Sequence, residues 1–272
     1  MSLFSGIGAP EKALTNLGVH YDLVAYSEID KFANKSYSLI HNVSEDLNLG
    51  DIQSVDGSEF EDIDLITYGF PCTSISHAGR REGFYDESGN KTQSGLFFDA
   101  LRVIQNSRPR VAIAENVKAL TFKRCTDEFS AVLSSLGEAG YNNYWKVLNT
   151  TDFNIPQNRE RVFVVSIRKD IDDGKFTFPI GEGLHYRLKD FLEDNVGEKY
   201  YLSEKMIKCI ASNGEKWTGN NNKSLINKSI ASTINTREGS RRCDASNFIA
   251  PDLEGEDIDL KPIIAKRKEF KN

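Results

Sequence analysis

The sequence has little of what builds metal centres and disulfide frameworks. Its four cysteines are widely spaced without a C-x-x-C pair, and its four histidines are scattered without an i, i+4 pair. Such spacing argues against a zinc site and against a disulfide scaffold. We therefore expect no metal and reduced thiols, as in a cytoplasmic protein.

Long apolar runs are also missing. No stretch approaches the roughly 20 apolar residues that a membrane span needs, and the amino-terminal residues do not resemble a signal peptide. We therefore expect a soluble protein located in the cytoplasm. With 272 residues and 39% hydrophobic composition, the chain can bury the core of one large domain and one smaller domain.

The chain has no surplus of positive charge. Its formal net charge is −6, which taken globally disfavours binding to nucleic acid. The distribution is uneven, because acidic residues crowd within 45–64 and basic residues gather at 80–81, 118–124, 159–161 and 237–242. Each basic group by itself is most simply solvated surface, but several that face one cleft would bind phosphates.

The most informative stretch is Gly69-Phe70-Pro71-Cys72-Thr73-Ser74-Ile75-Ser76, which follows the apolar run 63–68. Pro71 fixes φ and has no N–H, so the chain turns here instead of continuing as a strand. In an open α/β sheet, ligands bind at the carboxyl ends of the strands. An ordinary free cysteine is a small buried hydrophobe, but this setting makes Cys72 a candidate nucleophile.

The first residues predict the end of a strand, a glycine turn and a helix that Gly18 ends. Gly6-Ile7-Gly8 lets the backbone approach a ligand, and the helix amino terminus that follows favours an anionic group. The next predicted strand, 21–27, ends at Glu28, close to the interval at which an acid binds ribose hydroxyls. Together these features indicate a nucleoside site, whereas Glu28 alone could be a charge that stabilises a helix amino terminus.

The middle of the chain continues this alternation of strands and helices. A helix with Phe32, Ala33, Tyr37 and Ile40 on one face leads to the turn Gly50-Asp51-Ile52, whose aspartate could accept from an adenine amino group. A glycine-containing loop, 78–94, is long enough to be a mobile lid. A helix with Leu96, Phe97, Ala100, Leu101 and Ile104 at helical spacing follows it.

The next strand, 111–114, brings Glu115 to the same edge of the sheet as Cys72. After a helix around 129–136, strands 144–148 and 162–167 pair as an antiparallel edge hairpin whose loop, 157–161, carries Arg159 and Arg161. We predict an α/β fold with a doubly wound, mostly parallel Rossmann-like sheet over 1–169. A smaller, less regular domain follows over 170–250, and the charged tail 251–272 is expected to be poorly ordered.

In order and spacing, these segments resemble the motif series of the C5-cytosine DNA methyltransferases over about residues 3–168. The resemblance implies methyl transfer from S-adenosylmethionine to C5 of a flipped-out cytosine in double-stranded DNA, as a prokaryotic or phage modification of a specific site. It implies Cys72 as the nucleophile that bonds C6, Glu115 and Arg161 at the base, Arg159 near a phosphate, and 170–250 as the target-recognition domain. The residues implied to bind the cofactor are Phe4, Ser5, Gly6, Gly8, Glu28, Ile29, Asp51, Ile52, Pro71 and Leu96.

The sequence departs from the family pattern at Ala9 and Thr73, and the last two family motifs have no match. We therefore expect the chain alone to be incomplete, to need a second polypeptide or a carboxyl-terminal extension, and to expose an apolar patch near Phe4 and Leu14. Three alternatives stay open: an RNA cytosine methyltransferase, a catalytically silent half that binds DNA and cofactor, and a nicotinamide dehydrogenase. The dehydrogenase would leave Cys72 and Glu115 unused.

Overall fold

The computed structural model describes residues 1–72, 83–193, 196–197, 201–203, 227–233, 247 and 249. The chain forms two compact units, Met1–Leu148 with Glu160–Pro179, and Asn149–Arg159 with Ile180–Asn272. Each unit has its own sheet, of six strands in the first and two in the second, within the described residues. The tail 251–272 and most of 198–250 lie outside the described residues.

The first unit is an α/β fold with a mixed sheet in the order β2-β1-β3-β4-β7-β5. Strands β2, β1, β3 and β4 run parallel, whereas β7 runs antiparallel to β4 and lies beside β5 at the edge, as the predicted hairpin required. The strands span Ser2–Leu3 (β1), Tyr26–Ser27 (β2), Leu65–Tyr68 (β3), Val111–Val117 (β4), Tyr141–Asn149 (β5) and Glu160–Arg168 (β7).

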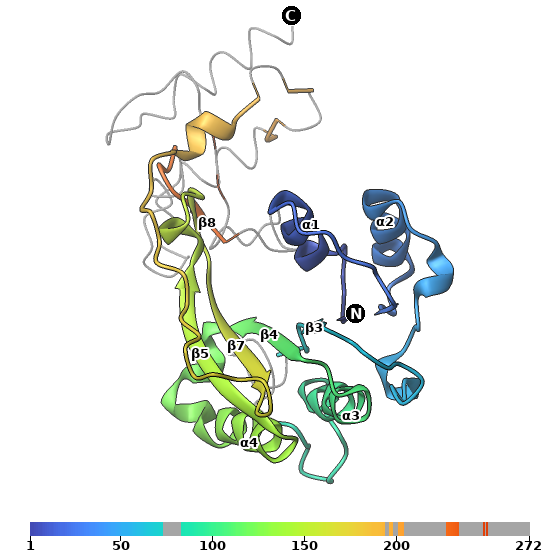
Figure 1. Ribbon diagram of the computed structural model, residues 1–272. Coiled ribbons are helices and arrows are strands. Elements are labelled where there is room, and N and C mark those ends of the chain that lie inside the picture. The colour runs from blue at the N-terminus through green and yellow to red at the C-terminus, as the bar shows by residue number, and fades with distance from the viewer. Residues whose placement is uncertain are drawn as a thin grey trace, which may run out of the picture. The chain divides into compact units, whose positions relative to one another are not determined.

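Helices cover both faces of this sheet. Figure 1 shows α1 and α2 on one side and α3 and α4 on the other. Their bounds are Ala9–Asn16 (α1), Lys31–His41 (α2), Phe97–Ser107 (α3) and Thr126–Glu138 (α4). Short 3-10 helices connect the elements of the two units: Glu45–Leu47 (η1), Ile52–Ser54 (η2), Ser94–Leu96 (η3), Lys118–Thr121 (η4), Lys123–Cys125 (η5), Thr150–Asp152 (η6) and Leu188–Phe191 (η7).

The core of the first unit lies around β3, which has a neighbouring strand on each side. Ile66 on β3, Val103 and Ile104 on α3, and Val132 and Leu136 on α4 have no exposed surface and belong to one apolar cluster. Burying each such side chain contributes about 1.5–3 kcal/mol, so the core holds the strand that leads to Cys72 firmly in place.

Three elements differ from the sequence-based prediction. Strand β2 is limited to Tyr26–Ser27 because its partner β1 offers only Ser2 and Leu3 for pairing. Strand β4 extends through Val117, since β7 pairs with it along its whole length. On α2, Tyr37 is fully buried, but Phe32 and Ile40 are 72% and 51% exposed, so these side chains do not share one buried face.

The second unit contains a short parallel pair, β6 (Gln157–Asn158) and β8 (Ala231–Ser232). A groove of about 800 Å³ lies beside it and is lined by residues of this unit, among them Thr151, Asp152, Asn158, Lys228 and Thr233.

None of the helices in the described part of the chain combines the length and hydropathy of a bilayer span. The described residues also contain no cluster of three side chains placed to hold a metal ion.

Candidate active site

The sequence-predicted residues of the first unit gather at one edge of the sheet. Because β2, β1, β3 and β4 are parallel, their carboxyl ends lead to Phe4, Glu28 and Cys72, while β4 itself carries Glu115. This edge is where open α/β sheets bind ligands. The strand-end prediction therefore holds at the level of topology.

The glycine turn after β1 is open and strained. Phe4, Gly6 and Gly8 have φ values of 54°, 56° and 82°, a region that favours glycine. A Cβ at Gly6 would meet nothing within 4 Å, which leaves free space against the backbone, whereas one at Gly8 would lie 2.1 Å from His41 Nε2. Gly6 thus suits a ligand, and Gly8 permits close packing of the turn on α2.

Glu28 fastens this turn to the end of β2. Its Oε2 accepts from the Gly6 amide at 2.8 Å, and its Oε1 accepts from the Asp30 amide at 2.7 Å. Each carboxylate oxygen has a further lone pair for a ligand hydroxyl. The side chain therefore fixes the shape of the turn while keeping capacity to accept from a ribose.

Asn48 completes this arrangement, although the sequence analysis did not select it. Its side chain accepts from the amides of Glu28 and Gly50, both at 3.0 Å, and donates to the Glu28 carbonyl at 3.0 Å. Asn48 thereby joins the end of β2 to the turn at Asp51. The only signal in the sequence is an asparagine two residues before a glycine, which is typical of many turns.

Asp51 and Ile52 form the third part of this edge. Asp51 is exposed and caps η2 by accepting from the Gln53 amide at 3.0 Å, while Ile52 is 3% exposed. Ile29, just after Glu28, is 76% exposed, and Leu96 of η3 is half-buried. Asp51 offers an acceptor, and Ile29 offers an unpartnered apolar surface for a flat ring.

The residues around the glycine turn fit S-adenosylmethionine. The buried hydroxyl of Ser5 has no hydrogen-bond partner among the described residues, and Gly8, which precedes α1, provides no side-chain cap. An uncapped helix amino terminus binds a carboxylate, and a buried hydroxyl needs a polar partner. Carboxylate, ribose and adenine thus each find a matching group along one edge.

Cys72 follows Pro71 directly after β3, and both residues are half-buried. The thiol packs against the apolar core, and this burial raises its pKa to about 11; Cys125 and Glu115 add to the rise, while Arg161 opposes it. A raised pKa keeps the sulfur as a thiol near neutral pH. Residues 73–82, which include the first five residues of the predicted lid 78–94, lie outside the described residues.

Glu115 points toward the cysteine strand. A Cβ at Gly69 would lie 3.7 Å from Glu115 Oε2, and Glu115 Oε1 forms an ion pair with Arg161 Nε at 2.9 Å. Arg161 enters from β7, where it pairs with Val117 of β4. The arginine is only 19% exposed at its side chain, so the pair lies in a partly desolvated place where its electrostatic attraction is strengthened.

Asn116 is a second residue that the sequence-based reasoning did not select. It is 4% exposed, and its Nδ2 donates to the Phe70 carbonyl at 3.0 Å. This bond joins β4 to the backbone two residues before Cys72, so it helps to set the position of the sulfur. The sequence feature that could have pointed to Asn116 is its position directly after Glu115, near the end of a predicted strand.

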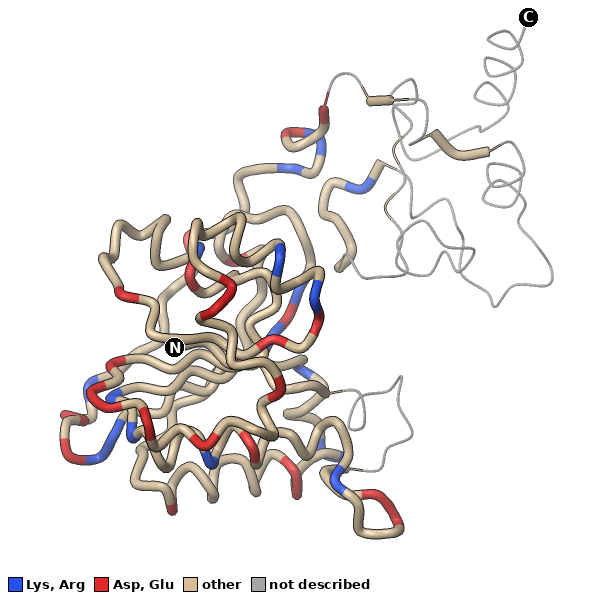
Figure 2. The backbone as a smooth tube through the Cα atoms, turned by 90° about the vertical axis from the view of Figure 1, so that its right-hand side faces the viewer, with Lys and Arg blue, Asp and Glu red and all other residues tan. Residues whose placement is uncertain are grey.

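Arg159 belongs to the second unit, whereas Arg161 belongs to the first. The Arg159 backbone is held within its own unit, where its amide donates to Asn149 Oδ1 at 3.1 Å and its carbonyl accepts from the Thr150 amide at 3.2 Å. The structure thus places Cys72, Glu115 and Arg161 in one unit. Figure 2 shows acidic and basic positions interspersed along the first unit.

Comparisons with known proteins identify the family of the chain. The family model described as C-5 cytosine-specific DNA methylase matches residues 1–270. Orphan methyltransferase M.Rho11sI of Bacillus phage rho11s is 37% identical over 295 residues, which cover 95% of this chain and 58% of that protein. Type II methyltransferase M2.ScrFI of Lactococcus lactis subsp. cremoris is 40% identical, over 66% of this chain and 51% of that protein.

The fold is also shared with solved structures. The crystal structure of S. pombe Dnmt2 methyltransferase matches with a TM-score of 0.65 at 18% identity, over 98% of this chain and 79% of that chain. The chain spans between half and three fifths of the length of the curated relatives M.Rho11sI, M.SPRI and M.SPBetaI. On the match over residues 1–270, the chain belongs to the C-5 cytosine-specific DNA methylase family.

Proposed function

We propose that this chain transfers a methyl group from S-adenosylmethionine to C5 of a flipped-out cytosine in double-stranded DNA. The observation that carries the proposal is the juxtaposition of Cys72, at the end of β3, with the Glu115–Arg161 ion pair on β4 and β7. C5 of cytosine is a weak nucleophile, so the reaction needs a thiolate that adds to C6 and a polar environment that stabilises the adduct.

The cofactor would lie along the edge from the glycine turn to Asp51. Ser5, Gly6 and the start of α1 would hold its carboxylate end, Glu28 its ribose, and Asp51 with Ile29 its adenine, with Phe4, Gly8, Ile52, Pro71 and Leu96 completing the site. When bound, the sulfonium supplies an electrophilic methyl group.

The protein side chains act on the base. Cys72 Sγ gives its proton to water and bonds C6, which breaks the C5=C6 π bond and makes C5 nucleophilic. After methylation C5 gives its proton to water, the C5=C6 bond forms again, the C6–Sγ bond breaks and the thiolate leaves. Glu115 interacts with the N3 and amino edge, and Arg161 with O2, where charge accumulates. The target cytosine must leave the duplex to reach Sγ, which is the general requirement of enzymes that modify a base.

The second unit is proposed as the target-recognition domain, with Arg159 near a phosphate. Its groove beside β6 and β8 offers Lys228 and several hydroxyl groups for contacts with DNA. Exchanging this unit with that of a relative should change the methylated sequence. An unchanged target sequence after the exchange would show that the assignment is wrong.

We also propose that a segment outside this chain, from a second polypeptide or an extension, covers apolar side chains around α1 and α2. Phe4 and Leu14 are half-buried, but Leu17 is 76% exposed, Phe32 72% and Leu39 70%. Large exposed apolar patches mark interaction sites. Methyl transfer should then appear, or rise strongly, when a fragment with the two unmatched family motifs is added. Rapid multiple turnover by the lone chain would reject this proposal.

The test of the proposed activity is methylation of a mixed-sequence DNA library, read by bisulfite sequencing, with an RNA library in parallel. We expect conversion-resistant cytosines at one short motif in DNA, and none with Cys72→Ala. Modification confined to RNA would favour the RNA methyltransferase instead. Binding of DNA and cofactor without methylation, even with the added fragment, would favour the catalytically silent alternative.

A further inference from the structure

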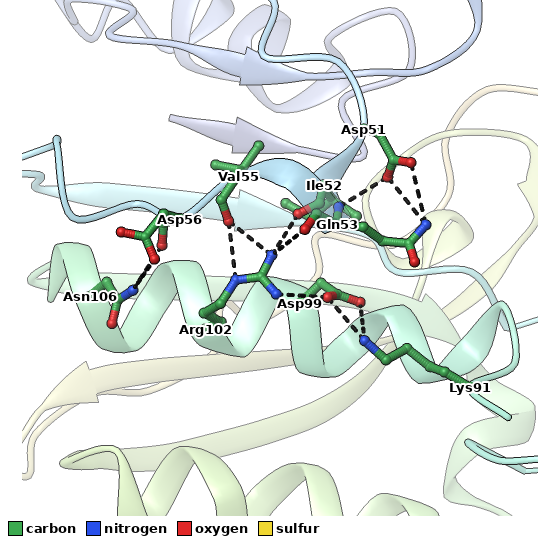
Figure 3. Close-up of polar contacts among 9 residues, drawn as sticks. All are labelled: Asp51, Ile52, Gln53, Val55, Asp56, Lys91, Asp99, Arg102 and Asn106. Carbon is green, nitrogen blue, oxygen red and sulfur yellow. Dashed lines mark hydrogen bonds and ion pairs between the residues drawn. The ribbon is translucent and has the colours of Figure 1, made fainter. Parts of the chain in front are cut away.

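Asp99 is a buried carboxylate that the proposed chemistry does not use. It lies on α3 with 2% of its side chain exposed, between two cations. Lys91 Nζ is 3.0 Å from Oδ1 and 2.9 Å from Oδ2, and Arg102 NH1 is 2.9 Å from Oδ1 (Figure 3). A buried charge is costly unless it is paired and hydrogen-bonded, so this arrangement needs both partners.

The other nitrogen atoms of the Arg102 guanidinium donate hydrogen bonds to backbone carbonyls of η2 and of Val55, the residue that follows it. Its NH2 donates to the carbonyls of Ile52, Gln53 and Val55 at 2.9, 3.1 and 2.9 Å, and its Nε donates to the Val55 carbonyl at 3.2 Å. Figure 3 shows the guanidinium lying between α3 and the turn that begins at Asp51. One planar group thereby fixes three carbonyls that lie about fifty residues away in sequence.

Lys91 connects the same carboxylate to the segment 83–92. This segment folds back on itself, since Tyr85 and Lys91 form an antiparallel bridge and the Thr92 amide donates to the Phe84 carbonyl at 3.0 Å. Phe84 packs on Phe97 of α3 with ring centroids 5.9 Å apart. The segment is thus held on α3 by this aromatic contact as well as by Lys91.

We infer that Asp99 and Arg102 are positioning residues for cofactor binding: they hold the turn Asp51–Val55 so that the Asp51 carboxylate faces the adenine amino group. The inference rests on the proposed function, which puts Asp51 in the cofactor site. The Asp51 carboxylate is held by Gln53, whose backbone amide donates to Oδ1 at 3.0 Å and whose Nε2 donates to Oδ1 at 3.5 Å and to Oδ2 at 3.3 Å. Gln53 is itself held through its carbonyl by Arg102. A lysine at 102 cannot supply the planar fork that reaches these carbonyls and Asp99 together.

The test is the dissociation constant of S-adenosylhomocysteine, measured calorimetrically on the 272-residue chain. Arg102→Lys should weaken binding roughly tenfold, the effect of losing about one charge-assisted hydrogen bond. Asp99→Asn, which keeps the shape of the side chain, should act in the same direction. The matched control is Arg110→Lys, because Arg110 is 60% exposed at its side chain and pairs only loosely, at 3.7 Å, with exposed Asp64.

A double-mutant cycle with Asp51→Ala separates positioning from general stability. If Arg102 acts through Asp51, Arg102→Lys should weaken binding by less than about twofold once Asp51 is alanine. The same tenfold loss in both backgrounds, or equal constants for Arg102→Lys and Arg110→Lys, would overturn the inference and leave the cofactor site standing. No binding by the unaltered chain would contradict the proposed cofactor site and with it the inference. No loss of affinity with Asp51→Ala would show that Asp51 does not contact the cofactor, which overturns the inference alone.

Discussion

Arg161 Nε lies 2.9 Å from Glu115 Oε1, and the two side chains come from antiparallel neighbours β7 and β4. Each fixes the other before any base is bound. Such preorganisation is the main source of electrostatic stabilisation in enzymes, because no reorganisation is needed when charge develops. Substituting Glu115 or Arg161 is therefore the most direct way to test how the site stabilises charge on the base.

Glu115→Gln and Arg161→Lys should each lower kcat by roughly 10²–10³, the range seen when one preorganised polar group is removed. Glu115→Gln keeps the shape of the side chain and Arg161→Lys keeps its charge, so the melting temperature should change less than kcat. Lys35→Gln, which breaks the exposed pair of Lys35 with Glu45, is the control and should leave kcat unchanged. A pair of site variants with normal kcat would show that Glu115 and Arg161 do not act on the base.

The raised pKa of Cys72 predicts how its reactivity depends on pH. Because burial raises the pKa to about 11, the thiol is protonated at neutral pH, and the reactive thiolate should increase about tenfold per pH unit until the pH approaches that value. The rate of Cys72 alkylation by iodoacetamide, followed by mass spectrometry, measures this. A plateau below about pH 9 would show an activated thiolate in the free chain.

Gly6→Ala and Gly8→Ala should have different effects. Both positions have positive φ, which costs an alanine about 1–2 kcal/mol, but only at Gly8 would the new Cβ collide with His41. Gly8→Ala should therefore lower the melting temperature more. Gly6→Ala should mainly weaken binding of S-adenosylhomocysteine, because its Cβ fills the open space beside the turn. Equal cofactor affinity for Gly6→Ala and the unaltered chain would place the ligand elsewhere.

Asn116→Ala should reduce kcat while leaving the affinity for cofactor nearly unchanged. It removes the donor to the Phe70 carbonyl and leaves a buried acceptor unpaired, at a cost of about 1–3 kcal/mol. Asn143→Ala is the matched control, because Asn143 Nδ2 donates to the Leu133 carbonyl at the same distance, 3.0 Å, away from Cys72. The control should lose stability but keep kcat; an equal kcat for the two variants would deny Asn116 a positioning role.

The sequence was sufficient to predict that Cys72 and Glu115 lie at the ends of neighbouring strands. Apolar runs that end in Cys72 and Glu115 predict two parallel strands, and β3 and β4 are indeed paired in that way. The contacts of Asn48 and Asn116 could not be predicted, because each depends on a partner 20 or 46 residues away. The length of β2 also depends on tertiary pairing, since the apolar residues from Tyr21 to Val24 find no strand beside them.

The central claim is that Cys72 bonds C6 of the target cytosine, and DNA that carries 5-fluorocytosine tests it most directly. Fluorine at C5 cannot leave as a proton does, so the adduct should persist as a denaturant-stable complex once S-adenosylmethionine is present. The measurement uses the chain with and without the fragment proposed above, beside Cys72→Ala and Cys125→Ala. We predict a stable complex with the unaltered chain and with Cys125→Ala, but none with Cys72→Ala. An equally stable complex with Cys72→Ala would contradict the account.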